Sequence, residues 1–139
     1  MLVDEIASFL VSQSIAVSGS TASWCVAKQY EPATPDRVFT VVETGGFPNE
    51  GLSTGTVDRP TFQLRVRGPI ANAGTASAST ARVKIEKARA ALEGQLNTLI
   101  GGWKYLHIKA NHPAMYLGRD NTMRDTLVMI FTALRSRTS

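Results

Sequence analysis

The spacing of hydrophobic and polar positions along this chain predicts two helices. Residues 2–13 carry apolar side chains at intervals of three to four, with two acids in the first turn, where the helix dipole favours negative charge. Residues 75–97 carry a longer stripe, for which we expect Thr75 or Ser77 to cap the start and Gly94 to end or bend the helix. The stripe consists of Ala78, Ala81, Ile85, Ala88, Leu92, Leu96 and Leu99.

A period of two predicts the strands. In residues 61–67 three apolar side chains alternate with polar ones, which places Arg65 and Arg67 together on the face opposite the core. Residues 37–43 and 126–134 are apolar at nearly every position, which is typical of strands covered on both faces. Two further strands are predicted at 24–30 and 103–110.

This order of elements predicts one α+β domain over residues 1–139. We expect an antiparallel or mixed sheet of about four to five strands, with an N-terminal helix and one long central helix packed on it. The connection at 44–60 is rich in glycine and proline, and we expect a long flexible loop there. A second connection is expected at 113–125, and residues 135–139 read as a basic tail.

The net charge of +4 conceals an uneven distribution. Residues 1–60 hold seven acids against three bases, whereas residues 61–139 hold twelve bases against four acids. Such a distribution suits head-to-tail contact with another subunit, or a basic face toward nucleic acid.

Catalytic chemistry finds little support in the residues. Cys25 is the single cysteine and lies in an apolar run, so we interpret it as a small buried hydrophobe. His107 and His112 are the two histidines, and without further cysteines they define no zinc cluster. The glycine-rich segments do not follow a phosphate-binding motif. We therefore assign no catalytic, cofactor-binding or metal-binding residue, and expect the protein not to be an enzyme.

Nothing in the sequence predicts a membrane protein. The acidic start without an early basic region argues against a signal peptide. The longest stretch without a charged residue, 68–81, is too polar to span a membrane. We expect the chain to fold in a cytoplasm.

Three ordered segments then carry a family resemblance. They are VETGGFP at 42–48, DRPTFQLRVRG at 58–68 and LGRD at 117–120, with the long helix between the last two. In this order the chain resembles the minor capsid or tail-terminator family of long-tailed bacteriophages. The resemblance covers nearly the whole chain.

The resemblance implies a structural virion protein that forms a ring, typically a hexamer, on the head-proximal end of the tail tube. It would stop tube growth there, after assembly in the host cytoplasm, and present a surface for joining the head. Its implied partners are further copies of itself, the tail-tube protein and the head-tail connector, while DNA passes through the ring without specific binding. The candidate interface residues are Gly46, Arg59, Arg65, Arg67, Arg119, Asp120 and Arg124.

Other functions stay open at this point. Within virion structure the chain could be another head-tail connector or completion protein, or a tail-tube subunit. From a different class, the basic part with Trp103, Tyr105 and Tyr116 nearby is compatible with a nucleic-acid-binding module. An unrecognised hydrolase is the third alternative.

Overall fold

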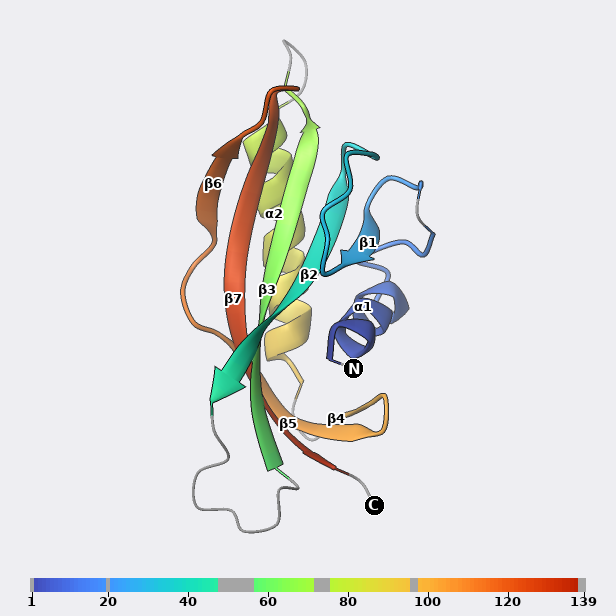
Figure 1. Cartoon of the computed structure of the whole chain (residues 1–139), viewed down its shortest axis with the longest axis vertical. Helices are drawn as coiled ribbons and strands as arrows, with labels where there is room; N and C mark the ends of the chain where they lie inside the picture. Colours follow the sequence, from blue (N-terminus) through green and yellow to red (C-terminus); the bar gives the residue numbers. More distant parts are fainter. Residues whose placement is uncertain (1, 20, 48–56, 72–75, 96–97, 138–139) are drawn as a thin grey trace.

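A computed structural model describes residues 2–19, 21–47, 57–71, 76–95 and 98–137. Within them the chain forms two helices and seven strands (Figure 1). The elements are α1 (Leu2–Ser12), β1 (Cys25–Lys28), β2 (Val38–Phe47), β3 (Val57–Ile70), α2 (Ser77–Glu93), β4 (Thr98–Ile100), β5 (Trp103–Ala110), β6 (Met115–Arg119) and β7 (Arg124–Arg137). The α+β class is therefore correct.

The strands form one mixed sheet in the order β1-β2-β3-β7-β5-β4. β1 lies parallel to β2, and the other neighbours are antiparallel. β7 is 14 residues long, which leaves room for two strands to pair with it, one after the other, along the edge opposite β3. β6 takes the half at 125–128, and β5 takes the half at 131–137.

The expected four to five strands are too few, because two short strands escaped the pattern. β4 has three residues, and it includes Leu99, which the sequence pattern places on the helix stripe. In the structure Leu99 is 66% exposed and pairs with Lys104 across a tight turn at Gly101 and Gly102. β6 lies inside the connection expected at 113–125, and all of its apolar side chains are exposed. Neither strand has the apolar alternation that marks a buried face.

The loop expected at 44–60 is also shorter than predicted. Residues 44–47 continue β2 and residues 57–60 begin β3, while 48–56 lie outside the described residues. The two strands pair past a bulge between Glu43 and Gly45. The expected basic tail is likewise mostly strand, because β7 continues to Arg137 and buries Arg135.

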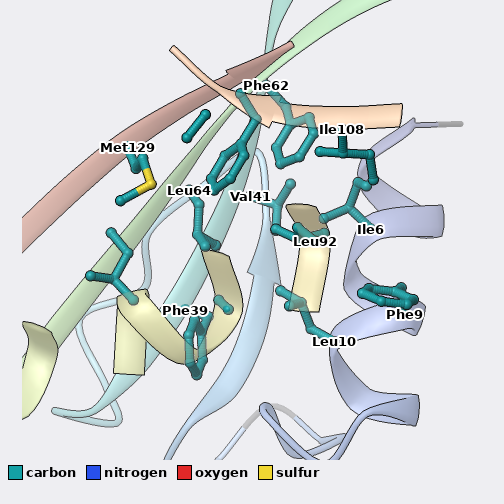
Figure 2. Close-up of a cluster of buried hydrophobic side chains, with 14 of the residues drawn as sticks. Ile6, Phe9, Leu10, Phe39, Val41, Phe62, Leu64, Leu92, Ile108 and Met129 are labelled. Carbon is teal, nitrogen blue, oxygen red and sulfur yellow. The ribbon is translucent and has the colours of Figure 1, made fainter. Parts of the chain in front are cut away.

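Both helices cover the same face of the sheet. α2 packs on β3, β7 and β5, and α1 packs on β1, β2 and β4. Figure 2 shows the core between them, where Ile6 and Leu10 of α1 meet Leu92 of α2 and side chains of the sheet. Phe62 and Phe131 stack with ring centroids 5.2 Å apart, on facing positions of β3 and β7.

The start of α2 depends on a glycine in β3. A Cβ atom at Gly68 would collide with the backbone carbonyl of Ser77, so only glycine lets the helix begin this close to the strand. Ser77 does not cap the helix as expected. Its buried hydroxyl instead accepts a hydrogen bond from the Asp125 N–H at 2.8 Å, which fastens α2 to the start of β7. The helix ends at Gly94, where an end or a bend was expected, so it is shorter than the predicted range 75–97.

Candidate functional site

The seven candidate residues fall into two groups near opposite ends of β3. The first group is Gly46 and Arg59, which lie on the paired ends of β2 and β3. A Cβ atom at Gly46 would overlap the Arg59 carbonyl oxygen and the Pro60 Cα atom, so this pairing requires glycine. The Arg59 side chain is exposed.

The second group is centred on two buried arginines that hold the segment before β2 against the sheet. Arg67 donates from Nε to the Asp36 carbonyl at 2.9 Å and from Nη2 to the Pro35 carbonyl at 2.6 Å. Arg124 donates from Nη1 to the Ala33 carbonyl at 2.6 Å. These bonds satisfy backbone carbonyls that the irregular segment itself leaves unpaired.

Acids neutralise both guanidinium groups within the chain. Glu31 lies 3.6 Å from Arg67 and 3.8 Å from Arg65. Asp36 and Asp120 lie 3.2 and 2.8 Å from Arg124. The pKa of Arg67 is lowered mainly because burial desolvates its guanidinium group, and also because the positive charge of Arg124 lies nearby.

Asp120 organises the turn between β6 and β7. Its Oδ1 accepts hydrogen bonds from the backbone N–H groups of Thr122 and Arg124 and from the Thr122 hydroxyl, and Oδ2 accepts from Arg124 Nε. Desolvation opposes the charged form, but these donors outweigh it and lower the pKa of Asp120 to about 2. Asp120, a candidate interface residue, thus forms an internal salt bridge with Arg124.

Asp125 pairs with a different arginine, Arg119. The pair is bidentate, with Nε and Nη2 each 2.9 Å from a carboxylate oxygen, and the Tyr116 hydroxyl donates to the same carboxylate at 2.7 Å. The Arg119 hydrogen bond is the main cause that lowers the pKa of Asp125. Because Asp125 is buried and Arg119 is 42% exposed, the contact joins β6 to β7 and leaves the outer edge of the guanidinium accessible.

The structure revises the assignment of Arg67. The alternation places Arg65 and Arg67 on the same face, and this is correct, but Arg67 is 5% exposed and directs its donors into its own chain. Arg67 and Arg124 therefore serve the fold. Arg65 is 35% exposed and, with Arg59 and Arg119, stays available for a partner.

A second polar network was not predicted. Arg135 donates to Glu5 at 3.0 Å and to Asp58 at 3.1 Å, and its guanidinium carbon lies 4.0 Å from the centroid of the Trp103 ring. The Tyr105 hydroxyl donates to Glu5 at 2.6 Å, and desolvation with this bond raises the pKa of Tyr105. Position 135 follows a run that is apolar at nearly every position, and it gives no signal of a buried cation.

The two networks account for much of the uneven charge. Four acids of residues 1–60 pair inside the chain with arginines of residues 61–139. They are Glu5, Glu31, Asp36 and Asp58. The asymmetry along the sequence is thus largely resolved within one subunit.

Exposed apolar side chains gather instead on β6. Met115, Tyr116 and Leu117 are 48%, 55% and 53% exposed, and we call these three side chains, which point to alternate faces of the sheet edge, the β6 patch. α1 and β1 lie on the opposite side of the molecule from β6 (Figure 1). They border a hollow of 410 Å³, which is lined by Ala7, Val11 and Val26 together with polar residues such as Ser8, Ser12 and Lys28. Large exposed apolar patches on a soluble domain commonly mark contact surfaces.

The described residues show few features of a catalytic or metal-binding site. Cys25 is 2% exposed, and burial raises the pKa of its thiol. Across the described ranges, no three His, Cys, Asp or Glu side chains are arranged to hold a metal ion. Neither α1 nor α2 has the length and apolar character needed to cross a membrane.

These features define a small α+β domain with internal ion networks and exposed apolar residues at a sheet edge. A family model described as bacteriophage tail terminator protein matches residues 9–134. The chain belongs to this family, and it is therefore a component of a phage tail.

Two further comparisons add little. A solved structure with a TM-score of 0.49 and 17% identity aligns over 99% of this chain and 92% of its own. A search of curated proteins finds none that matches.

Proposed function

We propose that this protein caps the head-proximal end of the phage tail tube as a ring of identical subunits. In this role it stops tube growth and offers a surface for joining the head. The observation that carries the proposal is the family match over residues 9–134. The role is structural and calls for no catalytic residue.

The position of two surfaces supports a ring. The β6 patch and the α1–β1 hollow lie on opposite sides of the subunit (Figure 1). A ring of identical subunits needs two different complementary surfaces, since each subunit meets its neighbours head to tail. We propose that the β6 patch of one subunit packs against the α1–β1 surface of the next.

The β6 edge also suits such a contact for a backbone reason. Among the described strands, β6 pairs with β7 alone, so its other edge carries N–H and C=O groups that no described strand satisfies. An incoming segment would pair with this edge and cover the apolar side chains in the same step.

The proposal is tested by assembling phage without this protein. We expect tails of uncontrolled length that do not join heads, seen by electron microscopy, and restoration when the wild-type chain is supplied. Tails of normal length joined to heads would refute the proposal. Long filaments formed by the pure protein would instead indicate a tail-tube subunit.

A further inference from the structure

The sheet face away from the helices carries a group of exposed basic side chains at the β5 end. α2 lies behind β3 and β7 in Figure 1, which leaves their other face open. On that face Lys104 pairs with Ser136, His107 with Leu134, and Lys109 with Thr132. Thr132 also pairs with Thr61 of β3, and Arg59 lies two residues before Thr61 and so on the same face. We call Arg59, Lys104, His107 and Lys109 the basic face; all four are exposed.

The charge of the basic face is not balanced by nearby acids. Within the described residues, Arg59, Lys104 and Lys109 take part in none of the ion pairs, which involve Lys28 and the arginines 65, 67, 89, 119, 124 and 135. Glu93 lies near Lys109, but its carboxylate already accepts hydrogen bonds from the Ala110 N–H and from Arg89. Desolvation opposes the charged form of Glu93, and these two bonds, more than the Lys109 charge, lower its pKa. The open face therefore keeps a positive potential.

The internal networks decide what kind of partner can neutralise this charge. Of the ten acids within the described residues, nine already form ion pairs within the subunit. A second copy of this chain therefore has few free carboxylates to offer. The basic face fits a separate polyanion better than a neighbouring subunit.

The side chains around the cations favour nucleic acid over an acidic protein. They include the hydroxyl groups of Thr61, Thr132 and Ser136, with Leu134 half-buried at the centre. Of the large hydrophobic side chains that are exposed, Leu99 alone among the described residues pairs with a member of the basic face, Lys104, and the others lie elsewhere, such as on β6, on α2 and at the far end of β3. Protein interfaces usually need apolar anchors and are depleted in lysine, whereas phosphate oxygens are bound by Lys, Arg, Ser and Thr.

We propose that the basic face binds the phosphate backbone of double-stranded DNA without sequence preference. The cations stand on β3 and β5, on either side of β7, and no described aromatic side chain lies at a paired position between them where it could stack on a base. Contact is thus electrostatic, weak and lost as salt rises. The inference does not depend on the ring-capping proposal, because it rests on the charges of one subunit.

The test is fluorescence anisotropy of the full chain with a labelled DNA duplex, in a salt series rising to about 0.15 M. The double variant Lys104→Gln with Lys109→Gln removes two cations from the basic face. The matched control, Arg82→Gln with Lys87→Gln, removes two exposed cations from α2. Both variants have the same net charge, and equal melting temperatures confirm that both are folded.

We expect the wild type to bind at low salt. Each phosphate contact makes the slope of log K against log salt concentration steeper by about 0.9. The slope of the basic-face variant should therefore be shallower than that of the wild type by about 2, whereas the slope of the α2 variant should equal that of the wild type. Absence of binding at low salt overturns the proposal. An equal loss in both variants also overturns it, because net charge alone would then explain the binding.

Two further measurements separate the remaining partners. In the first, polyglutamate is added as a competitor at the same concentration of negative charge as the duplex. If it displaces the duplex, the basic face is assigned to an acidic protein and the DNA proposal is refuted. Two duplexes of unrelated sequence should bind alike, and a tenfold difference would refute binding without sequence preference. Tail assembly in the phage experiment is scored independently, so either proposal can fail while the other stands.

Discussion

Single residues in this protein take their roles from burial more than from residue type. Arg65 and Arg67 are two positions apart on one strand and face the same way. Arg67 lies under the segment before β2 and binds three of its carbonyl groups, whereas Arg65 stays 35% exposed beside Glu31 and Gln63. The alternation predicts the shared face, but the difference between the two arginines depends on a segment about thirty residues earlier in the chain.

The two arginines give the first prediction. Arg67→Ala leaves buried carbonyl groups and Glu31 without their donor, so we expect a loss of about 3 kcal/mol in the free energy of unfolding. Arg65→Ala removes a partly solvated ion pair and should cost less than about 1 kcal/mol. Urea unfolding of both variants measures the difference. Equal effects would show that Arg67 is not the anchor of this segment.

At the scale of elements, charged networks connect parts that the apolar core leaves separate. Arg135 on β7 forms ion pairs with Glu5 on α1 and with Asp58 on β3. The hydroxyl group of Tyr105 on β5 donates a hydrogen bond to the same Glu5 carboxylate. Each of these groups is expensive to bury alone, and the cost is offset because every member has a charged or hydroxyl partner. The turn between β6 and β7 depends in a similar way on Asp120.

Asp120 predicts an acid sensitivity. Its pKa is lowered from an ordinary value near 3.8 to about 2, so the folded state favours the charged form. The stability that this carboxylate contributes is fully present above about pH 5 and is lost as the pH falls toward 2. Asp120→Asn should be less stable at neutral pH and should lose part of this acid dependence. Thermal unfolding across the pH range measures it, and an unchanged acid profile in the variant would contradict the assignment.

At the scale of the whole molecule, the two exposed surfaces differ in chemistry and in place. The β6 patch is apolar and lies on a strand edge, while the basic face is polar and lies on the open sheet near β5. This separation allows one subunit to contact its own copies through one surface and a polyanion through another.

The β6 patch gives the prediction at this scale. Met115→Glu with Leu117→Glu places two charges on side chains that are already half exposed, so the melting temperature should change little. Subunit association should fail, because the charges would have to be buried in the contact. Sedimentation velocity measures the particle mass. The control Val83→Glu, on an exposed position of α2, should assemble like the wild type, and assembly of the β6 variant would refute the contact.

The amino-acid sequence by itself determined both helices, five of the seven strands and the α+β class. Each of those elements buries an apolar face, so its apolar side chains recur every two residues in a strand or about every 3.6 residues in a helix. This spacing is visible in a short stretch of sequence. The ordered motifs also predicted the tail terminator family. β4 was missed because it has only three residues, and β6 because all of its apolar side chains are exposed.

The tertiary structure alone decided how the charges are used. Pairs such as Glu5 with Arg135 join residues 130 positions apart, and no local pattern connects them. The sequence shows an acidic first part and a basic second part, which could have served contacts between subunits. Folding instead brings four of the early acids onto later arginines, because burying either charge alone would be costly. What remains exposed, and therefore available to partners, is decided by this pairing and cannot be read from the order of residues.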